Sequence, residues 1–321
     1  MWIIDMYKQL VTVILSVILI AGCAGERNNE WKEFNGVDFV VVIGVDGLSP
    51  DGIRTADTPY IDYLIEYGAS TLDARAVMPT VSSPNWASMI MGAGPEQHGV
   101  TSNSWRYDNF EITPTETGTG GFFPTIFSLM YEQRKDVKTS VFYDWPGIAN
   151  LFEYDLVDFT YTPDLPRDDT EDRVKRSEDT MENAISHLEE VQPGLMFIQL
   201  DHVDHFGHRF AHGSDEYYKS VQLADSLIGN MIAAIEDAGL QERTVIHISS
   251  DHGGIDYGHG GATDEEILIP WIIYGPEVIA GKELGPFINI YDTAATIAYI
   301  FGIETPDGWI ARPVKHAFVD D

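Results

Sequence analysis

Apolar runs alternate with amphipathic segments along most of the chain. Residues 39–45 read Phe-Val-Val-Val-Ile-Gly-Val, a nearly continuous apolar run typical of a strand that is covered on both faces. The same reasoning predicts further strands at residues 139–143, 195–200, 244–248 and 268–273. Buried strands that alternate with helices indicate a parallel sheet packed by helices on both sides.

Two helices between these strands have recognisable start signals. Thr58 followed by Pro59 predicts one helix, because threonine can cap a helix and proline fits its first turn. Ser214 predicts the start of a second helix, which Gly239 ends. One face of that helix would carry Tyr217, Val221, Ala224, Ile228, Met231 and Ile235. The pattern predicts an α/β fold, a three-layer α/β/α sandwich around a mainly parallel sheet.

The N-terminus has a different pattern. The apolar run at residues 10–20 would span roughly 17 Å as a helix, which is too short for the ~30 Å hydrocarbon core of a membrane. It ends in Ile20-Ala21-Gly22-Cys23, which resembles a bacterial lipobox. The resemblance implies that Cys23 is lipidated and anchors the protein to a membrane of the bacterial cell envelope. An ordinary cleaved signal peptide is the alternative.

The domain organisation follows from this reading. We expect a lipoprotein signal peptide at 1–22, a tether at 23–36 and a single domain at 37–321, with an insertion proposed at about 104–170. The insertion is proposed because the pattern of apolar residues is less regular there.

Composition excludes several classes of protein. The chain has 19 Lys and Arg against 51 Asp and Glu, a net charge of −32, so its surface repels phosphate backbones and polymeric nucleic acid is excluded as a partner. Hydrophobic residues make up 44% of the chain, enough for a substantial core. Cys23 is the single cysteine, so no internal disulfide can form.

Side chains that bind divalent metal ions come shortly after several of the predicted strands. They are Asp46, Asp204, His208, Asp251 and His252, with His259 in the glycine-rich loop that follows. Ligands of α/β proteins gather at the carboxyl ends of the strands, so we expect these six side chains to lie together. Aspartate and histidine are ligand types that a pair of divalent ions would use. Taken singly, each residue also has an ordinary explanation as a turn or surface residue.

A candidate nucleophile lies in the segment Met78-Pro79-Thr80-Val81-Ser82-Ser83-Pro84. Pro84 predicts the first turn of a helix, which places Ser82 or Ser83 at the helix N-terminus, where free N–H groups favour an anion. A plain capping serine is the alternative. A serine hydroxyl is a weak nucleophile unless a base or a metal activates it, and this chain offers metal ligands.

These motifs, taken together, resemble the alkaline phosphatase superfamily and, within it, the type I phosphodiesterase and nucleotide pyrophosphatase family. The motifs are Val45-Asp46-Gly47, Ser82-Ser83-Pro84-Asn85, Pro95-Glu96-Gln97-His98-Gly99, Asp204-His205-Phe206-Gly207-His208, Ser250-Asp251-His252-Gly253 and Gly258-His259-Gly260-Gly261. They occur in the family's order between about residues 38 and 314. The resemblance implies an alkaline phosphatase-like fold and a metal-dependent hydrolase of small phosphate esters.

The resemblance also implies roles for individual residues. Asp46, Asp251 and His252 would hold one ion, and Asp204, His208 and His259 the other. Both ions are expected to be zinc, with manganese as the alternative. Ser82 would be the nucleophile and form a phosphoseryl intermediate, with Thr80 as a weaker alternative. Asn103 would donate to a phosphoryl oxygen, or else be a turn residue.

Several readings remain open at this point. Ser83 stands where nucleotide-cleaving members of the family commonly have phenylalanine, so nucleotide preference is not implied. We expect a phosphodiesterase, with a phosphomonoesterase as the alternative. A monoester would need a further cation, for which Arg106 and Arg209 are candidates. Trp86 departs from the sulfatase pattern and disfavours that activity. A non-catalytic surface lipoprotein with this fold is the rival from another class.

Overall fold

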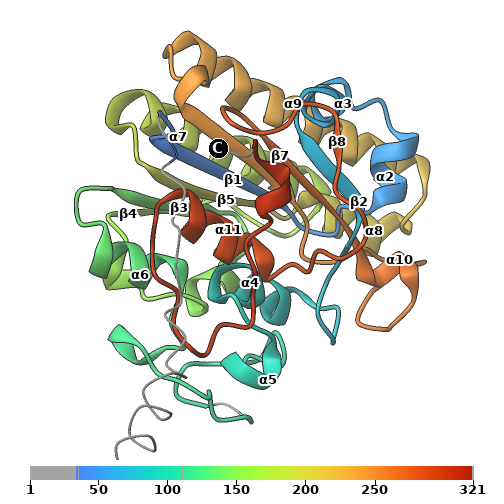
Figure 1. Cartoon of the computed structure of the whole chain (residues 1–321). Helices are drawn as coiled ribbons and strands as arrows, with labels where there is room; N and C mark the ends of the chain where they lie inside the picture. The colour runs from blue at the N-terminus through green and yellow to red at the C-terminus, as the bar shows by residue number, and fades with distance from the viewer. Residues whose placement is uncertain (1–33, 35, 110, 320–321) are drawn as a thin grey trace, which may run out of the picture. The chain divides into compact units, whose positions relative to one another are not determined.

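The structure is a computed structural model that describes residues 34, 36–109 and 111–319. An eight-stranded sheet has the order β4-β3-β5-β1-β6-β7-β2-β8 (Figure 1). The strands are β1 (Phe39–Val45), β2 (Ala69–Arg75), β3 (Thr139–Tyr143), β4 (Phe159–Tyr161), β5 (Leu195–Leu200), β6 (Thr244–Ser249), β7 (Leu268–Tyr274) and β8 (Lys282–Glu283). All five predicted strands are confirmed, the last two of them one residue longer. The three missed strands are short or carry polar and charged residues, so they lack the apolar signal.

The sheet is mixed but mostly parallel, as predicted. β1 pairs in parallel with β5 and β6, and β3 pairs in parallel with β4 and β5. Only the pairs that β7 makes with β6 and β2 are antiparallel among the described strands. The carboxyl ends of β1, β5 and β6 therefore meet at one edge.

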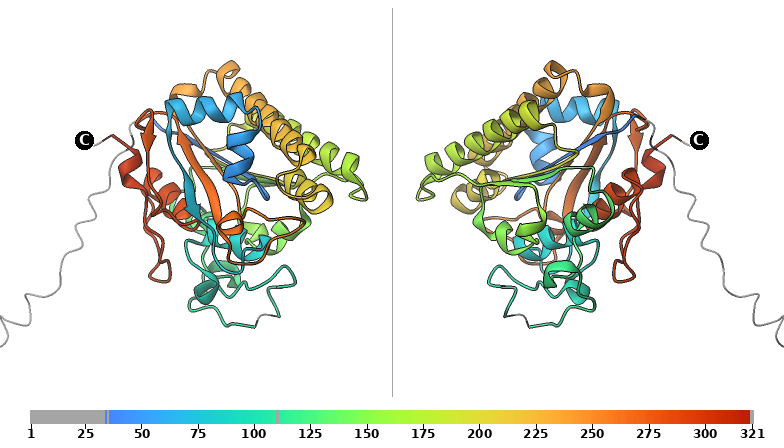
Figure 2. Two further views of the ribbon diagram at one scale, coloured as in Figure 1. Left: turned by 90° about the vertical axis from the view of Figure 1, so that its right-hand side faces the viewer. Right: turned by 90° about the vertical axis from the view of Figure 1, so that its left-hand side faces the viewer.

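Helices cover both faces of the sheet (Figure 2). One layer contains α2 (Pro50–Thr55), α3 (Pro59–Tyr67), α7 (Thr170–Val191), α8 (His202–Phe210) and α9 (Asp215–Asp237). The other contains α4 (Ser82–Met91), α6 (Ile126–Gln133) and α11 (Asp292–Ile300). Successive residues of β1 enter different cores: Val41 packs with the first layer, and Val40 and Val42 with the second. This alternation, which a strand imposes on its side chains, confirms the three-layer sandwich.

Short elements complete the chain. They are the helices α5 (Pro95–His98) and α10 (Asp264–Ile267) and 3-10 turns at Thr119–Gly121, Pro146–Asn150, Tyr154–Leu156, Gln241–Arg243 and Lys315–Ala317.

The two predicted helix starts differ in how they are capped. Ser214 Oγ accepts from Tyr217 N at 3.2 Å, as predicted for α9. Thr58 stands at the N-cap of α3, but its hydroxyl makes no capping bond and donates to the Ile53 carbonyl instead. The predicted start of α3, with Thr58 at the N-cap and Pro59 in the first turn, is confirmed. A carboxylate from α9 accepts from the first-turn amides in place of the Thr58 hydroxyl. Asp225 Oδ1 accepts from Ile61 N at 2.7 Å.

The segment 104–170 contains irregular chain and also α6, β3 and β4, which belong to the sandwich. The predicted signal peptide, most of the tether and Cys23 lie outside the described residues. Within the described ranges, no helix combines the length and the apolar character needed to cross a membrane.

Candidate metal centre

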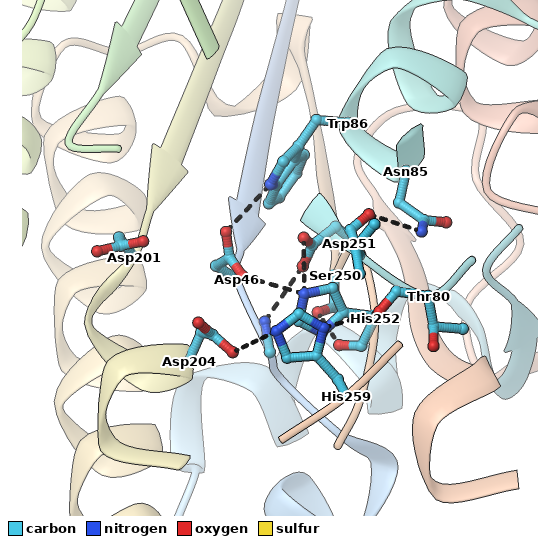
Figure 3. A network of polar contacts seen from close by, with 12 residues as sticks. Asp46, Thr80, Asn85, Trp86, Asp201, Asp204, Ser250, Asp251, His252 and His259 are labelled. Carbon is cyan, nitrogen blue, oxygen red and sulfur yellow. Dashed lines mark hydrogen bonds and ion pairs between the residues drawn. The ribbon is translucent and has the colours of Figure 1, made fainter. Parts of the chain in front are cut away.

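The predicted ligands gather at the edge where β1, β5 and β6 end (Figure 3). Asp46 follows β1 directly, while Asp251 and His252 follow β6. His252 Nε2 lies 3.5 Å from Asp46 Oδ1 and 3.2 Å from Asp251 Oδ2. These three buried side chains form a group whose ligand atoms lie within 4.8 Å of one another. The structure thus brings together the first predicted trio.

The second predicted trio is arranged differently. Asp204 and His208 lie on α8, and His259 Nε2 is 3.6 Å from Asp204 Oδ1. The tight group here is Asp204, His252 and His259, because the His252 and His259 rings stack with centroids 3.7 Å apart. His208 contacts this group from a half-exposed position, with its Nε2 3.3 Å from Asp204 Oδ2 and 3.1 Å from His259 Nε2. All six predicted side chains are therefore neighbours.

The three histidines present the same ring nitrogen to the site. Nδ1 lies 2.8 Å from the Gly253 carbonyl in His252, 2.9 Å from the Tyr257 carbonyl in His208, and 2.8 Å from the Thr80 carbonyl in His259. A carbonyl can only accept a hydrogen bond, so each Nδ1 carries the proton. In a neutral imidazole this leaves the Nε2 lone pair free to bind a cation.

Each buried carboxylate keeps one oxygen without a hydrogen bond. Asp46 Oδ2 accepts from Trp86 Nε1 at 3.1 Å and from Gln199 Nε2 at 3.2 Å, and Asp251 Oδ1 accepts from Gly47 N at 3.2 Å. The other atoms, Asp46 Oδ1, Asp204 Oδ1, Asp251 Oδ2 and His252 Nε2, are buried and have no hydrogen-bond partner among the described residues. Such orphaned atoms are costly unless a cation binds them, so the residues fit divalent metal ions.

The electrostatics of the site agree with this. Burial, followed by the charges of Asp251 and Asp204, raises the pKa of Asp46 well above its ordinary value. Burial also raises the pKa of Asp251 well above its ordinary value, with a further contribution from Asp204. In His252, burial lowers the pKa well below its ordinary value, which keeps the ring in its neutral form. Three buried carboxylates beside a neutral imidazole carry uncompensated negative charge when ionised, and a bound cation would compensate it.

The segment of the candidate nucleophile contacts this group, because the Thr80 carbonyl accepts from His259 Nδ1. Ser82 is the first residue of α4 and is buried. Thr80, two residues earlier, donates its hydroxyl hydrogen to the Gly261 carbonyl at 2.7 Å, and its Oγ1 accepts from Gly260 N at 3.0 Å. The Thr80 hydroxyl is therefore committed to the loop that carries His259, which disfavours Thr80 as the nucleophile.

Asn103 contacts the start of the same helix. Its Oδ1 accepts from Ser83 N at 2.7 Å, which fixes the amide and leaves its Nδ2 as a donor for another group. The predicted extra cations have other contacts. Arg106 Nη1 donates to the carbonyls of Trp105 at 2.6 Å and Asn103 at 3.3 Å, and the Arg209 guanidinium lies 6.0 Å from the Phe210 ring centroid.

A family model described as type I phosphodiesterase / nucleotide pyrophosphatase matches residues 40–268. The chain belongs to this family. Its members are phosphodiesterase and pyrophosphatase hydrolases that depend on metal ions, so the predicted enzyme class is confirmed at the level of the family.

Relatives within the family are distant and longer. Ectonucleotide pyrophosphatase/phosphodiesterase family member 3 of Rattus norvegicus is 24% identical over 243 residues, which cover 72% of this chain and 26% of the relative. An uncharacterized pyrophosphatase/phosphodiesterase of Schizosaccharomyces pombe is 26% identical over 239 residues, 71% of this chain and 47% of the relative. The chain spans about a quarter to a half of the length of these relatives.

Solved structures share the fold. Human ectonucleotide pyrophosphatase / phosphodiesterase 5 superposes with a TM-score of 0.69 at 14% identity, covering 88% of this chain and 100% of that chain. A putative sulfatase from Bacteroides thetaiotaomicron superposes with a TM-score of 0.70 at 16% identity, covering 88% and 74%. These likenesses confirm the alkaline phosphatase-like α/β/α sandwich.

Sequence reasoning missed the residues that orient the candidate metal-binding side chains. Trp86 and Gln199 both donate to Asp46, and Thr80 fixes His259. One signal was available for Trp86. Gly44 interrupts the bulky residues of the first strand, and a Cβ built there would lie 2.4 Å from the Trp86 ring. A glycine inside a strand often marks a site where another group packs closely against the backbone, but the sequence does not identify that group as Trp86.

Proposed function

We propose that this protein is a metal-dependent phosphodiesterase that uses two divalent ions, zinc in preference to manganese, and Ser82 as its nucleophile. The observation that carries the proposal is the set of buried, unpartnered ligand atoms on Asp46, Asp204, Asp251 and His252. They lie next to α4, whose Trp86 donates to Asp46. Asp46, Asp251 and His252 would hold one ion, and Asp204, His208 and His259 the other.

The chain's own groups support a displacement at phosphorus. When bound, the ions would neutralise charge on the reacting oxygens and favour the ionised serine. Ser82 Oγ would form a new bond to phosphorus as the bond to the departing alcohol oxygen breaks, which gives a phosphoseryl intermediate that water then hydrolyses. Asn103 Nδ2 and the N-terminus of α4 would stabilise the phosphoryl oxygens, and the support is the bond from Ser83 N to Asn103 Oδ1 at the start of that helix.

A diester is favoured over a monoester because of the charge it carries. A dianionic monoester would benefit from an added cation on the scissile phosphate itself. The two arginines predicted for that role make other contacts, because Arg106 Nη1 donates to backbone carbonyls and Arg209 lies over Phe210. Two divalent ions against three aspartates give a local charge of about +1, which suits a monoanionic diester. Since Ser83 replaces the phenylalanine common in nucleotide-cleaving members, the proposal does not require a nucleoside.

The test compares bis-p-nitrophenyl phosphate with p-nitrophenyl phosphate after chelation and zinc restoration. We expect zinc-dependent hydrolysis that prefers the diester and that Ser82→Ala lowers by at least about 10³-fold. Ser83→Ala, one residue along the same turn, is the matched control. A strong monoester preference would favour a phosphomonoesterase, and full turnover by Ser82→Ala would overturn the assignment of the nucleophile.

We also propose that lipidation of Cys23 holds the enzyme at the bacterial cell envelope, where it would meet small phosphate esters. The support is the lipobox-like segment Ile20–Cys23. Fatty-acid labelling in a bacterial host should mark the wild-type protein and not Cys23→Ser. Equal labelling of both would contradict the proposal.

A further inference from the structure

Two arginines lie at the edge of the sheet that carries the metal centre, and the proposed mechanism does not use them. Arg173 is the fourth residue of α7, and Arg167 lies three residues before that helix begins. Since α7 runs into β5 and packs against it, its N-terminus lies at the carboxyl end of β5. Asp201, the residue that follows β5, is labelled with Asp46 and Asp204 in Figure 3. The arginines are therefore neighbours of the proposed metal ligands.

A single carboxylate oxygen holds both arginines. Asp201 Oδ2 accepts from Arg167 Nη2 at 3.0 Å and also from Arg173 Nη1. Arg173 Nε donates to the Arg167 carbonyl at 3.1 Å, which fixes the two residues relative to each other. Two positive charges against one negative charge leave the cluster at +1, in a chain whose net charge is −32.

The nearby acidic residues do not neutralise the pair through the contacts that the structure shows. Asp169 caps α7 by accepting from Asp172 N, and Asp172 in turn accepts from Asp168 N. The contacts of both carboxylates are thus with backbone amides at the start of the helix. Among the described residues, Asp201 is thus the carboxylate that forms ion pairs with the two arginines.

The two arginine side chains are partly exposed, and one of their donors has no hydrogen-bond partner. The side chains of Arg167 and Arg173 are 27% and 21% exposed, so a solute can reach them. Arg167 Nε is buried and has no hydrogen-bond partner among the described residues. An unpaired buried donor on a charged group is costly, so the protein contacts of this guanidinium do not satisfy it fully.

The segment that carries Arg167 is held in place. Buried Arg176 donates to the carbonyls of Pro163 at 2.8 Å and Leu165 at 2.6 Å. The Thr170 hydroxyl lies 3.3 Å from Nε2 of His205, the residue that follows Asp204 on α8. The arginines are thus positioned before any ligand binds, which reduces the entropy lost on binding.

We propose that Arg167 and Arg173 form an anion subsite beside the metal centre, which binds a second negatively charged group of the substrate, such as a further phosphate. The inference rests on the proposed function, because it adds a binding group to the same site. Guanidinium groups suit phosphate because their fork of N–H donors matches its oxygens. The enzyme would therefore prefer esters and anhydrides that carry a charge beyond the scissile phosphate.

The test measures binding of inorganic pyrophosphate and of inorganic phosphate to the zinc-loaded protein by calorimetry. Arg167→Gln should weaken pyrophosphate binding by roughly tenfold and change phosphate binding by less than about twofold. Arg167→Lys should be intermediate, because it keeps the charge and loses the fork. Arg243→Gln is the matched control, since Arg243 pairs with Asp38 and precedes β6 at the opposite edge of the sheet. It should change neither affinity.

Kinetics give a second readout. Arg167→Gln should lower kcat/KM for a nucleoside triphosphate by roughly tenfold, mainly through KM, and leave bis-p-nitrophenyl phosphate nearly unchanged. Equal losses for both substrates and both anions would show a purely structural role and overturn the proposal, as would no loss at all. If the wild-type protein hydrolysed no phosphate ester, the proposed function would fail, while the calorimetric comparison would still decide the subsite.

Discussion

His259 Nδ1 lies 2.8 Å from the carbonyl oxygen of Thr80, and this contact joins the segment of the proposed nucleophile to a proposed metal ligand. The Thr80 hydroxyl strengthens the junction, because it accepts from Gly260 N and donates to the Gly261 carbonyl, in the two residues that follow His259. Neighbours of a ligand set its orientation and its tautomer, so the junction links the position of Ser82 to that of the metal centre.

Thr80→Val is expected to weaken zinc binding by about 10-fold to 100-fold, because it removes the hydroxyl that holds the His259 loop and keeps the side-chain shape. Competition with a chromophoric chelator measures the affinity. Thr55→Val, at an exposed position on α2, is the matched control and should leave the affinity unchanged. Equal affinities for wild type and Thr80→Val would contradict the positioning role.

Removal of metal is expected to lower the melting temperature, because the buried carboxylates of Asp46, Asp204 and Asp251 then lack compensating charge. Asp251→Asn removes one of these charges. It should melt above the metal-free wild type and lose most of the stabilisation by zinc. Thermal unfolding with and without chelator measures both effects.

The control for that experiment is Asp155→Asn, which removes one charge from an exposed site. Its response to zinc should match that of the wild type. If metal-free Asp251→Asn melted below the metal-free wild type, the claim that repulsion destabilises the empty site would be wrong.

Gly44→Ala is expected to destabilise the fold by about 1–3 kcal/mol, because its Cβ would lie 2.4 Å from the Trp86 ring. Displacement of the indole would also weaken its bond to Asp46. Trp86→Phe removes the indole atoms that the new Cβ would meet. In that background Gly44→Ala should therefore destabilise the fold less than it does in the wild type. A double-mutant cycle in urea measures the coupling, and strictly additive effects would show that the two residues do not interact.

A buried chain of hydrogen bonds predicts a pH-dependent contribution from Asp144. His202 Nε2 lies 3.1 Å from the Ser220 carbonyl, so it carries the ring proton and Nδ1 accepts from Ser177 Oγ at 2.8 Å. Ser177 Oγ also donates to Asp144 Oδ2, so its one hydroxyl hydrogen lies between the two buried groups. Burial, together with the charge of Asp201, raises the pKa of Asp144 to about 8.

The linkage between protonation and folding gives the direction in which the stability changes with pH. A pKa raised in the folded state means that folding retains a proton, so this stabilisation is complete below about pH 4 and is lost as the pH rises toward 8. Asp144→Asn removes the titratable group and keeps the shape of the side chain. Its stability relative to the wild type should rise by roughly 1 kcal/mol per pH unit between pH 5 and 8, measured by urea unfolding. A difference that does not change with pH would show that Asp144 is ionised throughout.

The sequence by itself determined the strands that lie inside the sandwich and the identity of the candidate ligands. Strands such as β1 are predictable because burial on both faces demands an uninterrupted apolar run, and that demand is local. Asp46, Asp204 and Asp251 follow such strands closely, so their convergence follows from the geometry of a parallel sheet. Strands such as β2, with alternating polar residues, gave no comparable signal.

Tertiary structure alone decided how those ligands are grouped and supported. His252 lies between both groups because its ring stacks on that of His259, a contact between loops that no spacing encodes. The bond from Trp86 to Asp46 and the pairing of Asp201 with two arginines also join segments far apart in the chain. Contacts of this kind depend on how distant segments pack in the folded protein, and local sequence patterns do not predict that packing.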